Sequence, residues 1–226
     1  MATTTFQAAH RAQMSLLAPL EKRTLLWLAA RTPPFIHSDH LTALGLASLL
    51  AAGVCYAISG AHPWALVAVI GLLIANWVGD SLDGTLARYR QRQRPRYGFY
   101  VDHVVDMFGT LFLLGGLGLS GYMSLWVAVG LIVTYYMLNI EVYLTTYTIG
   151  TFHISFGVFS PTELRILLAI GNLALLARGG WVVIAGEQYR LFDIGGVVGI
   201  AGMLVMLTMA TARHTAQLYK EERLPD

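Results

Sequence analysis

The chain has 226 residues, of which 56% are hydrophobic and only 12% are charged. Soluble domains carry about 25% charged residues, so this composition excludes an ordinary soluble globule. The single Cys55 excludes an intramolecular disulfide, and the first residues contain no apolar stretch after a basic start, so we expect neither a disulfide scaffold nor a cleaved secretory signal. The formal net charge of +2 does not indicate a nucleic-acid partner.

Stretches without charge predict the membrane spans, because a spanning helix needs about 20 mainly apolar residues. The segments that lack Asp, Glu, Lys and Arg are 41–61, 62–79, 107–140 and 194–212. The third is too long for one span, and the Gly-rich residues 115–124 in its middle predict a turn. A weaker apolar segment lies between Pro161 and Gly186. We therefore expect an all-α membrane protein with six transmembrane helices, near residues 39–60, 63–88, 98–119, 122–148, 162–186 and 192–214.

Basic residues gather on one side of these six spans. They precede the first span, join the second to the third, follow the fourth and close the chain: Arg11, Lys22, Arg23, Arg31, Arg88, Arg90, Arg92, Arg94, Arg96, Arg165, Arg213, Lys220 and Arg223. Only Arg178 and Arg190 fall on the opposite side. Because positive loops are retained in the cytoplasm, we expect both termini there, in a multi-pass protein such as one of a bacterial inner membrane.

The N-terminal segment differs from the spans. Residues 18–30 mix basic side chains with Leu and Trp, which is typical of an amphipathic helix lying in the membrane interface; a soluble N-terminal helix is the alternative. Pro33 and Pro34 are expected to end it. The predicted organisation is an N-terminal cytoplasmic or interfacial helix region (1–37), a six-helix transmembrane domain (38–215) and a cytoplasmic tail (216–226).

Four carboxylates lie close together in the sequence. Asp80 and Asp83 are three residues apart at the end of the second span, and Asp102 and Asp106 are four apart at the start of the third. Each pair falls on one helix face, and the short basic connection lets both faces meet in one cavity. Carboxylates that converge without counter-ions repel one another, and one or two hard divalent cations remove that conflict. The pattern predicts a metal site.

The residues that follow the first pair favour a phosphate ligand. Gly84 and Ala87 continue the carboxylate face and let a ligand approach the backbone, while Arg88 offers a planar fork of donors for phosphate. Another cytoplasmic arginine is the alternative interpretation of Arg88. Metal ions, an arginine and a small-residue face together predict a diphosphate site.

This string resembles the signature of the CDP-alcohol phosphotransferase family, DxxDGxxAR followed by a short loop and GxxxDxxxD. All the fixed positions are filled over 27 residues: Asp80, Asp83, Gly84, Ala87, Arg88, Gly98, Asp102 and Asp106. The loop from Tyr89 to Tyr97 is one residue longer than is usual in the family, and we expect its polar, Pro-containing sequence to absorb the extra residue.

The resemblance implies transfer of a substituted phosphate from a CDP-linked donor to an alcohol, with release of CMP, in phospholipid biosynthesis. It implies two divalent cations, Mg or Mn, and a homodimer among membrane lipids. By position, Asp80, Asp83 and Asp102 would be metal ligands, and Asp106 would be the general base and share a metal. The nucleotide would bind against Gly84, Ala87, Arg88 and Gly98.

The acceptor site is predicted from fewer signals: its candidates are Glu141, Glu163, Arg165 and His103. The Asp-His pair at His103 is similar to the choline and ethanolamine branch of the family, and two acids beside one base disfavour a phosphorylated alcohol. We therefore lean towards transfer of a choline- or ethanolamine-type group to a lipid alcohol. CDP-diacylglycerol-dependent transfer to a small polar alcohol is the alternative. For Glu141 a hydrogen bond inside the bundle is an equally good explanation. For Glu163 a capping role at the start of a helix is the simpler explanation.

Two other classes of protein also bind metal through aspartates. An intramembrane prenyltransferase has differently spaced motifs on a larger bundle. A divalent-cation transporter would not need the Gly84, Ala87 and Arg88 face, and would hold its carboxylates nearer the middle of the membrane.

Overall fold

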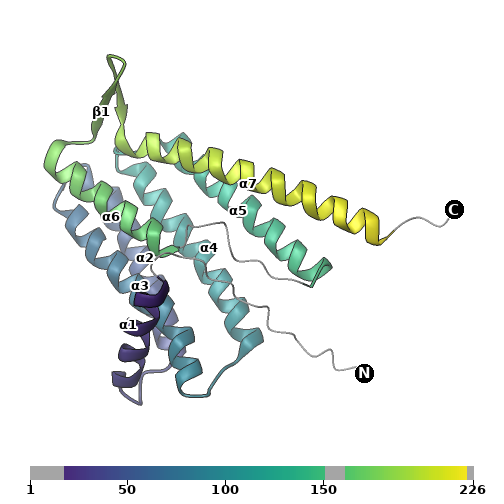
Figure 1. Ribbon diagram of the computed structural model, residues 1–226. Helices are drawn as coiled ribbons and strands as arrows, with labels where there is room; N and C mark the ends of the chain where they lie inside the picture. Colours follow the sequence, from purple (N-terminus) through teal and green to yellow (C-terminus); the bar gives the residue numbers. More distant parts are fainter. Residues whose placement is uncertain (1–17, 151–160, 223–226) are drawn as a thin grey trace.

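The computed structural model describes residues 18–150 and 161–222, which form helices and one small hairpin (Figure 1). The elements are α1 (Ala18–Arg31), α2 (Ser38–Ser59), α3 (Ala65–Tyr89), α4 (Pro95–Leu119), α5 (Leu125–Thr148), α6 (Pro161–Arg178), β1 (Trp181–Ile184), β2 (Glu187–Arg190) and α7 (Leu191–Glu221). In this described part, α2, α3, α4, α5 and α7 are long and apolar enough to cross a membrane. The predicted all-α membrane fold is confirmed.

Proline and glycine set several helix ends. Pro33 and Pro34 follow the last residue of α1, and Pro95 is the first residue of α4, where its missing N–H costs no hydrogen bond. Between α4 and α5, Gly121 has a φ of +80°, a conformation that favours glycine. The turn predicted within residues 115–124 is therefore present.

Helices α2, α3 and α4 form the closest packed part of the molecule. A side chain on Gly53 of α2 would collide with the carbonyl oxygen of Phe112 on α4, and one on Gly116 of α4 would collide with the carbonyl oxygen of Gly53. Gly79 of α3 makes a similar close approach to α2 at Gly45, where an added Cβ would lie 2.6 Å from the Gly45 nitrogen. These small residues bring α2 against both helices that carry the aspartates.

Gly116→Ala should destabilise the protein by about 1–3 kcal/mol, because the new methyl group must push α4 away from the α2 backbone. Gly115→Ala is the matched control, since within the described part of the chain nothing lies within 4 Å of a Cβ at that neighbouring position. Thermal unfolding in detergent measures both. Equal melting temperatures for the two variants would contradict the close α2–α4 packing.

The prediction of a helix from 162 to 186 is wrong for residues 179–186. Helix α6 ends at Arg178, Gly179 has a φ of +78°, and the next residues form the β1–β2 hairpin. Ile184 pairs with Glu187, and Ala185 and Gly186 between them both have positive φ, as a two-residue hairpin turn of this hand requires. Helix α6, with Glu163, Arg165 and Arg178 among its 18 residues, is too polar to count among the five candidate spans, and the predicted number of six is not reached in the described residues.

The last helix is longer than expected. Helix α7 begins at Leu191, as predicted to within one residue, but it continues to Glu221 instead of ending near residue 214. It lies along α5, and its far end projects away from α2, α3 and α4 (Figure 1).

The two ends of the bundle differ in chemistry. The Arg-rich connection between α3 and α4 lies at one end, and the β1–β2 hairpin protrudes at the other (Figure 1). At the hairpin end Trp64, Trp126 and Trp181 are exposed, a position that suits the aromatic belt of a membrane interface. Helix α1 is present as predicted and packs on α3 through Leu25 and Ala29; its location in the interface stays a prediction.

Candidate active site

The predicted site residues come from the end of α3 and the start of α4, which the Arg-rich connection joins. The charges of Asp80 and Asp102 act on Asp83, and the charges of all three act on Asp106. The structure therefore brings the four carboxylates into one electrostatic group. Asp83 is buried, with 7% of its surface exposed, and the other three are half-buried.

Helix α2 supplies a polar contact that the sequence analysis missed. The Thr42 hydroxyl donates a hydrogen bond of 2.7 Å to Asp83 Oδ2. The other oxygen, Oδ1, lies 2.5 Å from the backbone nitrogen of Gly84. Both oxygens of Asp83 are thus held by neighbouring donors, which fixes the side chain where α2 crosses α3. Thr42 is 41 residues away in sequence, so only the three-dimensional packing reveals the pair.

Helix α6 supplies a cation to the carboxylate group. Arg165 donates from Nη2 to Asp80 Oδ2 at 2.5 Å and from Nε to Asn76 Oδ1 at 2.7 Å. Asn76 in turn donates to the Gly45 carbonyl at 3.0 Å. Arg165, a predicted acceptor residue, therefore lies directly on Asp80, a predicted metal ligand. The charge of Arg165 also acts on Asp106.

The remaining signature residues lie on α3 and α4, and one of them, Ala87, lines a pocket. Arg88 Nη2 donates to Thr85 Oγ1 at 3.2 Å, and its Nη1 lies 3.3 Å from where a Cβ on Gly84 would stand, so any larger residue would press on the guanidinium. Gly98 is half-buried, and none of the residues that the structure describes comes within 4 Å of an added Cβ. Ala87 lines a pocket of about 490 Å³. Asp83 precedes Ala87 on the same helix by one turn, so pocket and carboxylates are neighbours.

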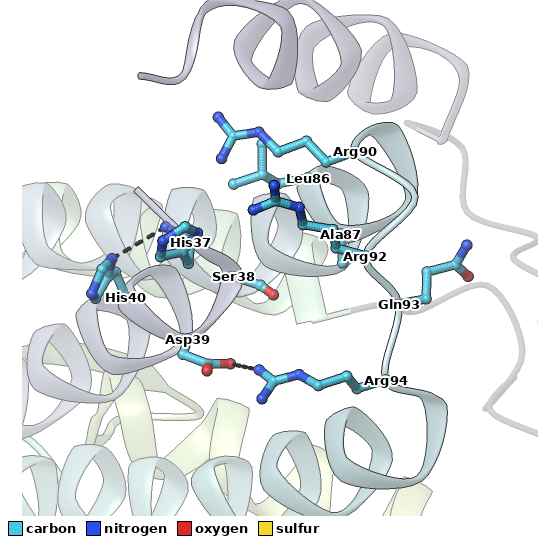
Figure 2. Close-up of a pocket in the computed structure, with 10 residues that line it drawn as sticks. All are labelled: His37, Ser38, Asp39, His40, Leu86, Ala87, Arg90, Arg92, Gln93 and Arg94. Atoms are coloured by element: carbon cyan, nitrogen blue, oxygen red, sulfur yellow. Dashed lines mark hydrogen bonds and ion pairs between the residues drawn. The ribbon is translucent and has the colours of Figure 1, made fainter. Parts of the chain in front are cut away.

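Figure 2 shows how this pocket is built from the start of α2, the end of α3 and the Arg-rich connection. Its lining consists of His37, Ser38, Asp39, His40, Leu86, Ala87, Arg90, Arg92, Gln93 and Arg94. Asp39 and Arg94 form an ion pair across it, and this hydrogen bond raises the pKa of Arg94 above its usual range. Arg90 donates to the carbonyls of Ile36 and Thr32 at 2.6 and 2.7 Å, which ties the connection to the α1–α2 segment.

The other acceptor candidates lie in different surroundings. The His103 ring packs on Phe99, at a centroid distance of 4.2 Å, and edge-on against Tyr143 of α5, at 5.2 Å. Its Nδ1 lies 2.5 Å from the Phe99 carbonyl. His103 thus faces the α4–α5 contact. Glu163 lies half-buried in the first turn of α6, two residues before Arg165.

Glu141 has a partner that the sequence did not reveal. Its Oε1 lies 2.6 Å from His214 Nδ1 on α7, and it accepts a hydrogen bond of 2.9 Å from Thr145. Of the two explanations considered for Glu141, the structure favours the hydrogen bond inside the bundle, because the carboxylate joins α5 to α7. The 73 residues between the partners hide this contact in the sequence.

The fold and the site together define an integral membrane helix bundle with two pairs of aspartates beside a basic pocket. The family model of CDP-alcohol phosphatidyltransferases matches residues 35–212, well over half of the chain. The chain therefore belongs to the CDP-alcohol phosphatidyltransferase family, and it is a transferase of phospholipid synthesis that uses a CDP-alcohol.

The family is generally dependent on divalent cations, and the donor set of this chain fits such ions chemically. Mg²⁺ and Mn²⁺ prefer oxygen ligands, and four carboxylates share one electrostatic group here. Within residues 18–150 and 161–222, no three acidic, His or Cys side chains lie at the separations of a metal site. The assignment of individual ligands stays a prediction.

Proposed function

We propose that the chain transfers a substituted phosphate from a CDP-linked donor to the hydroxyl of a lipid alcohol and releases CMP. The observation that carries this proposal is the group of four carboxylates on α3 and α4. One of them, Asp83, lies one helical turn before Ala87, which lines a pocket together with arginines of the connection. Carboxylates that can hold divalent cations, together with a guanidinium and a small-residue face, suit a nucleotide diphosphate bound beside a reacting hydroxyl.

We propose the following roles for the site residues. Asp80, Asp83, Asp102 and Asp106 would hold the divalent cations, which when bound would neutralise charge on the diphosphate and on the leaving CMP. Arg88, beside Gly84, binds the diphosphate, and Ala87 and Gly98 leave room for the nucleotide. The oxygen of the acceptor hydroxyl bonds to the phosphorus of the transferred group while the bond between that phosphorus and CMP breaks. Asp106 accepts the proton that the hydroxyl loses.

The preference for a neutral lipid alcohol is supported by the partners of Arg165. This guanidinium is paired with Asp80 and hydrogen-bonded to Asn76, so its charge is already compensated. Glu163 in the same helical turn adds negative charge. A phosphate dianion on the acceptor would meet unfavourable electrostatics there, whereas a neutral hydroxyl would not. CDP-diacylglycerol-dependent transfer to a small polar alcohol remains the alternative, and family membership gives no support to a transporter.

An acceptor panel tests this preference. With purified protein and Mg²⁺ or Mn²⁺, we expect CMP release from CDP-choline or CDP-ethanolamine when diacylglycerol is added, and little release from CDP-diacylglycerol with glycerol 3-phosphate or inositol phosphate. Arg165→Ala should retain part of the activity with the lipid acceptor. Rapid CMP release from CDP-diacylglycerol with either phosphorylated alcohol would move the enzyme to the alternative branch.

We further propose that the Arg-rich end, the pocket and both termini are cytoplasmic, because the positive residues gather there. A cysteine at Gln93 in the α3–α4 connection should react with a membrane-impermeant reagent only in inside-out vesicles. One at Gln188 in the hairpin should react in intact cells. Both positions are exposed, so accessibility alone does not separate them. Labelling of position 93 in intact cells would show that the protein has the opposite orientation. The homodimer implied by the family stays a prediction.

A further inference from the structure

Arg165 lies near the start of α6, yet its side chain is largely buried. Its side chain is only 14% exposed and is fixed at two points on α3, Asp80 and Asn76. Asn76 is itself buried and held by the Gly45 carbonyl of α2. The guanidinium is therefore set into the carboxylate group by a chain of contacts that runs through three helices.

This placement has an electrostatic consequence. Four carboxylates share the site, and Arg165 is the cation whose charge acts on Asp106 alongside the charges of Asp80, Asp83 and Asp102. It bonds to Asp80 Oδ2 at 2.5 Å, which uses an oxygen that a divalent cation would also need. A guanidinium and a divalent cation on one carboxylate also repel each other strongly in a partly buried site.

We propose that Arg165 is an internal counter-ion that competes with a divalent cation for Asp80, so that cation binding displaces the guanidinium and turns it towards the diphosphate of the CDP-linked donor. This inference rests on the proposed function, since it requires that the aspartates bind the cation. Arg165 would then act as a switch. The divalent cation replaces its guanidinium at Asp80, and the same step frees the guanidinium to bind phosphate.

The surroundings of α6 allow the side chain to move without the helix. Thr162 in the same first turn donates to Glu21 Oε1 of α1 at 3.1 Å. The same oxygen accepts hydrogen bonds from Trp77 Nε1 at 3.0 Å and from Ser81 Oγ at 3.3 Å, both on α3. Glu21 thus ties the start of α6 to α3 independently of Arg165. When the guanidinium leaves Asp80, the backbone of α6 is still anchored.

The test measures Mn²⁺ binding by full-length, metal-free protein in detergent, using the electron paramagnetic resonance signal of free Mn²⁺. Arg165→Met should bind Mn²⁺ about tenfold more tightly than wild type, because the competing cation is gone. It should also unfold at a lower temperature in EDTA and gain more from added Mn²⁺. Arg178→Met, at the exposed other end of α6, is the matched control and should match wild type.

Weaker Mn²⁺ binding by Arg165→Met would show that the arginine only holds Asp80 in place, and unchanged binding would show that the two cations do not compete; either result overturns the inference. Arg165→Gln, which keeps a donor for Asn76, replaces the Met variant if that one does not fold. If neither wild type nor the Arg165 and Arg178 variants bound Mn²⁺, the proposed metal site would be overturned instead. The proposed function and this inference therefore fail by different results.

Discussion

Asp106→Asn is expected to lower the rate of CMP release by about 10²–10⁴-fold while leaving affinity for the CDP-linked donor close to wild type. The amide has nearly the shape of the carboxylate but cannot accept the proton of the attacking hydroxyl. Donor binding depends mainly on the other three aspartates and on Arg88, and so it should survive. Turnover is measured by CMP release, and donor affinity by equilibrium binding of a CDP-alcohol without acceptor.

Asp193→Asn provides the control for this experiment. Asp193 lies at the hairpin end, where its Oδ1 accepts a hydrogen bond of 2.6 Å from the Ser124 backbone, and an asparagine oxygen can accept the same bond. Turnover should be retained in this variant. If Asp106→Asn kept near-normal turnover, the assignment of the general base would be wrong, and another of the four carboxylates would have to take that role.

Asp80→Asn, Asp83→Asn and Asp102→Asn are each expected to reduce turnover to background and to weaken stabilisation by Mn²⁺, because each removes a charged ligand. Melting temperatures with and without Mn²⁺ measure the second effect. The same Asp193→Asn control should keep the full Mn²⁺ response. A variant of this set that retained both turnover and the Mn²⁺ response would not be a ligand.

The three variants should differ in stability without metal. Asp80→Asn leaves Arg165 without its carboxylate, so it should melt below Asp102→Asn in EDTA. With Arg165 14% and Asp80 36% exposed, the loss should stay below the roughly 3–5 kcal/mol typical of a fully buried pair. Asp83→Asn can keep the Thr42 hydrogen bond through its amide oxygen, but it loses the contact with the Gly84 N–H, because the amide nitrogen is a donor. The reverse order would contradict the Asp80–Arg165 pair.

Hydropathy and charge were sufficient to predict most of the helices. The long apolar stretches became α2 to α5 and α7, because a spanning helix needs only length and apolar composition, both of which are local properties. The β1–β2 hairpin was missed because residues 181–184 are as apolar as a span, and only the backbone conformation at Gly179 and Gly186 ends the helix and turns the chain. Apolar runs of this length do not by themselves separate helix from strand.

The site was predictable where its residues are neighbours in sequence and not where they are distant. The spacing within α3 and α4 placed each aspartate pair on one face. The contact of Thr42 with Asp83 and that of Arg165 with Asn76 join residues 41 and 89 positions apart, and the sequence did not predict either contact. The partner of Glu141 is likewise distant, on α7. Such pairings depend on how the helices cross, which in this bundle is set by close contacts such as Gly45 with Gly79.

The proposed transfer reaction is tested most directly by following both products at once. Purified protein is incubated with Mg²⁺ or Mn²⁺, a CDP-linked donor and a lipid alcohol, and CMP and the new phospholipid are quantified in the same samples. We expect equal amounts of CMP and of a lipid that carries the phosphate of the donor, neither forming in EDTA or with Asp106→Asn. Absence of CMP with CDP-choline, CDP-ethanolamine and CDP-diacylglycerol alike, or CMP without any transferred lipid, would contradict the proposed function.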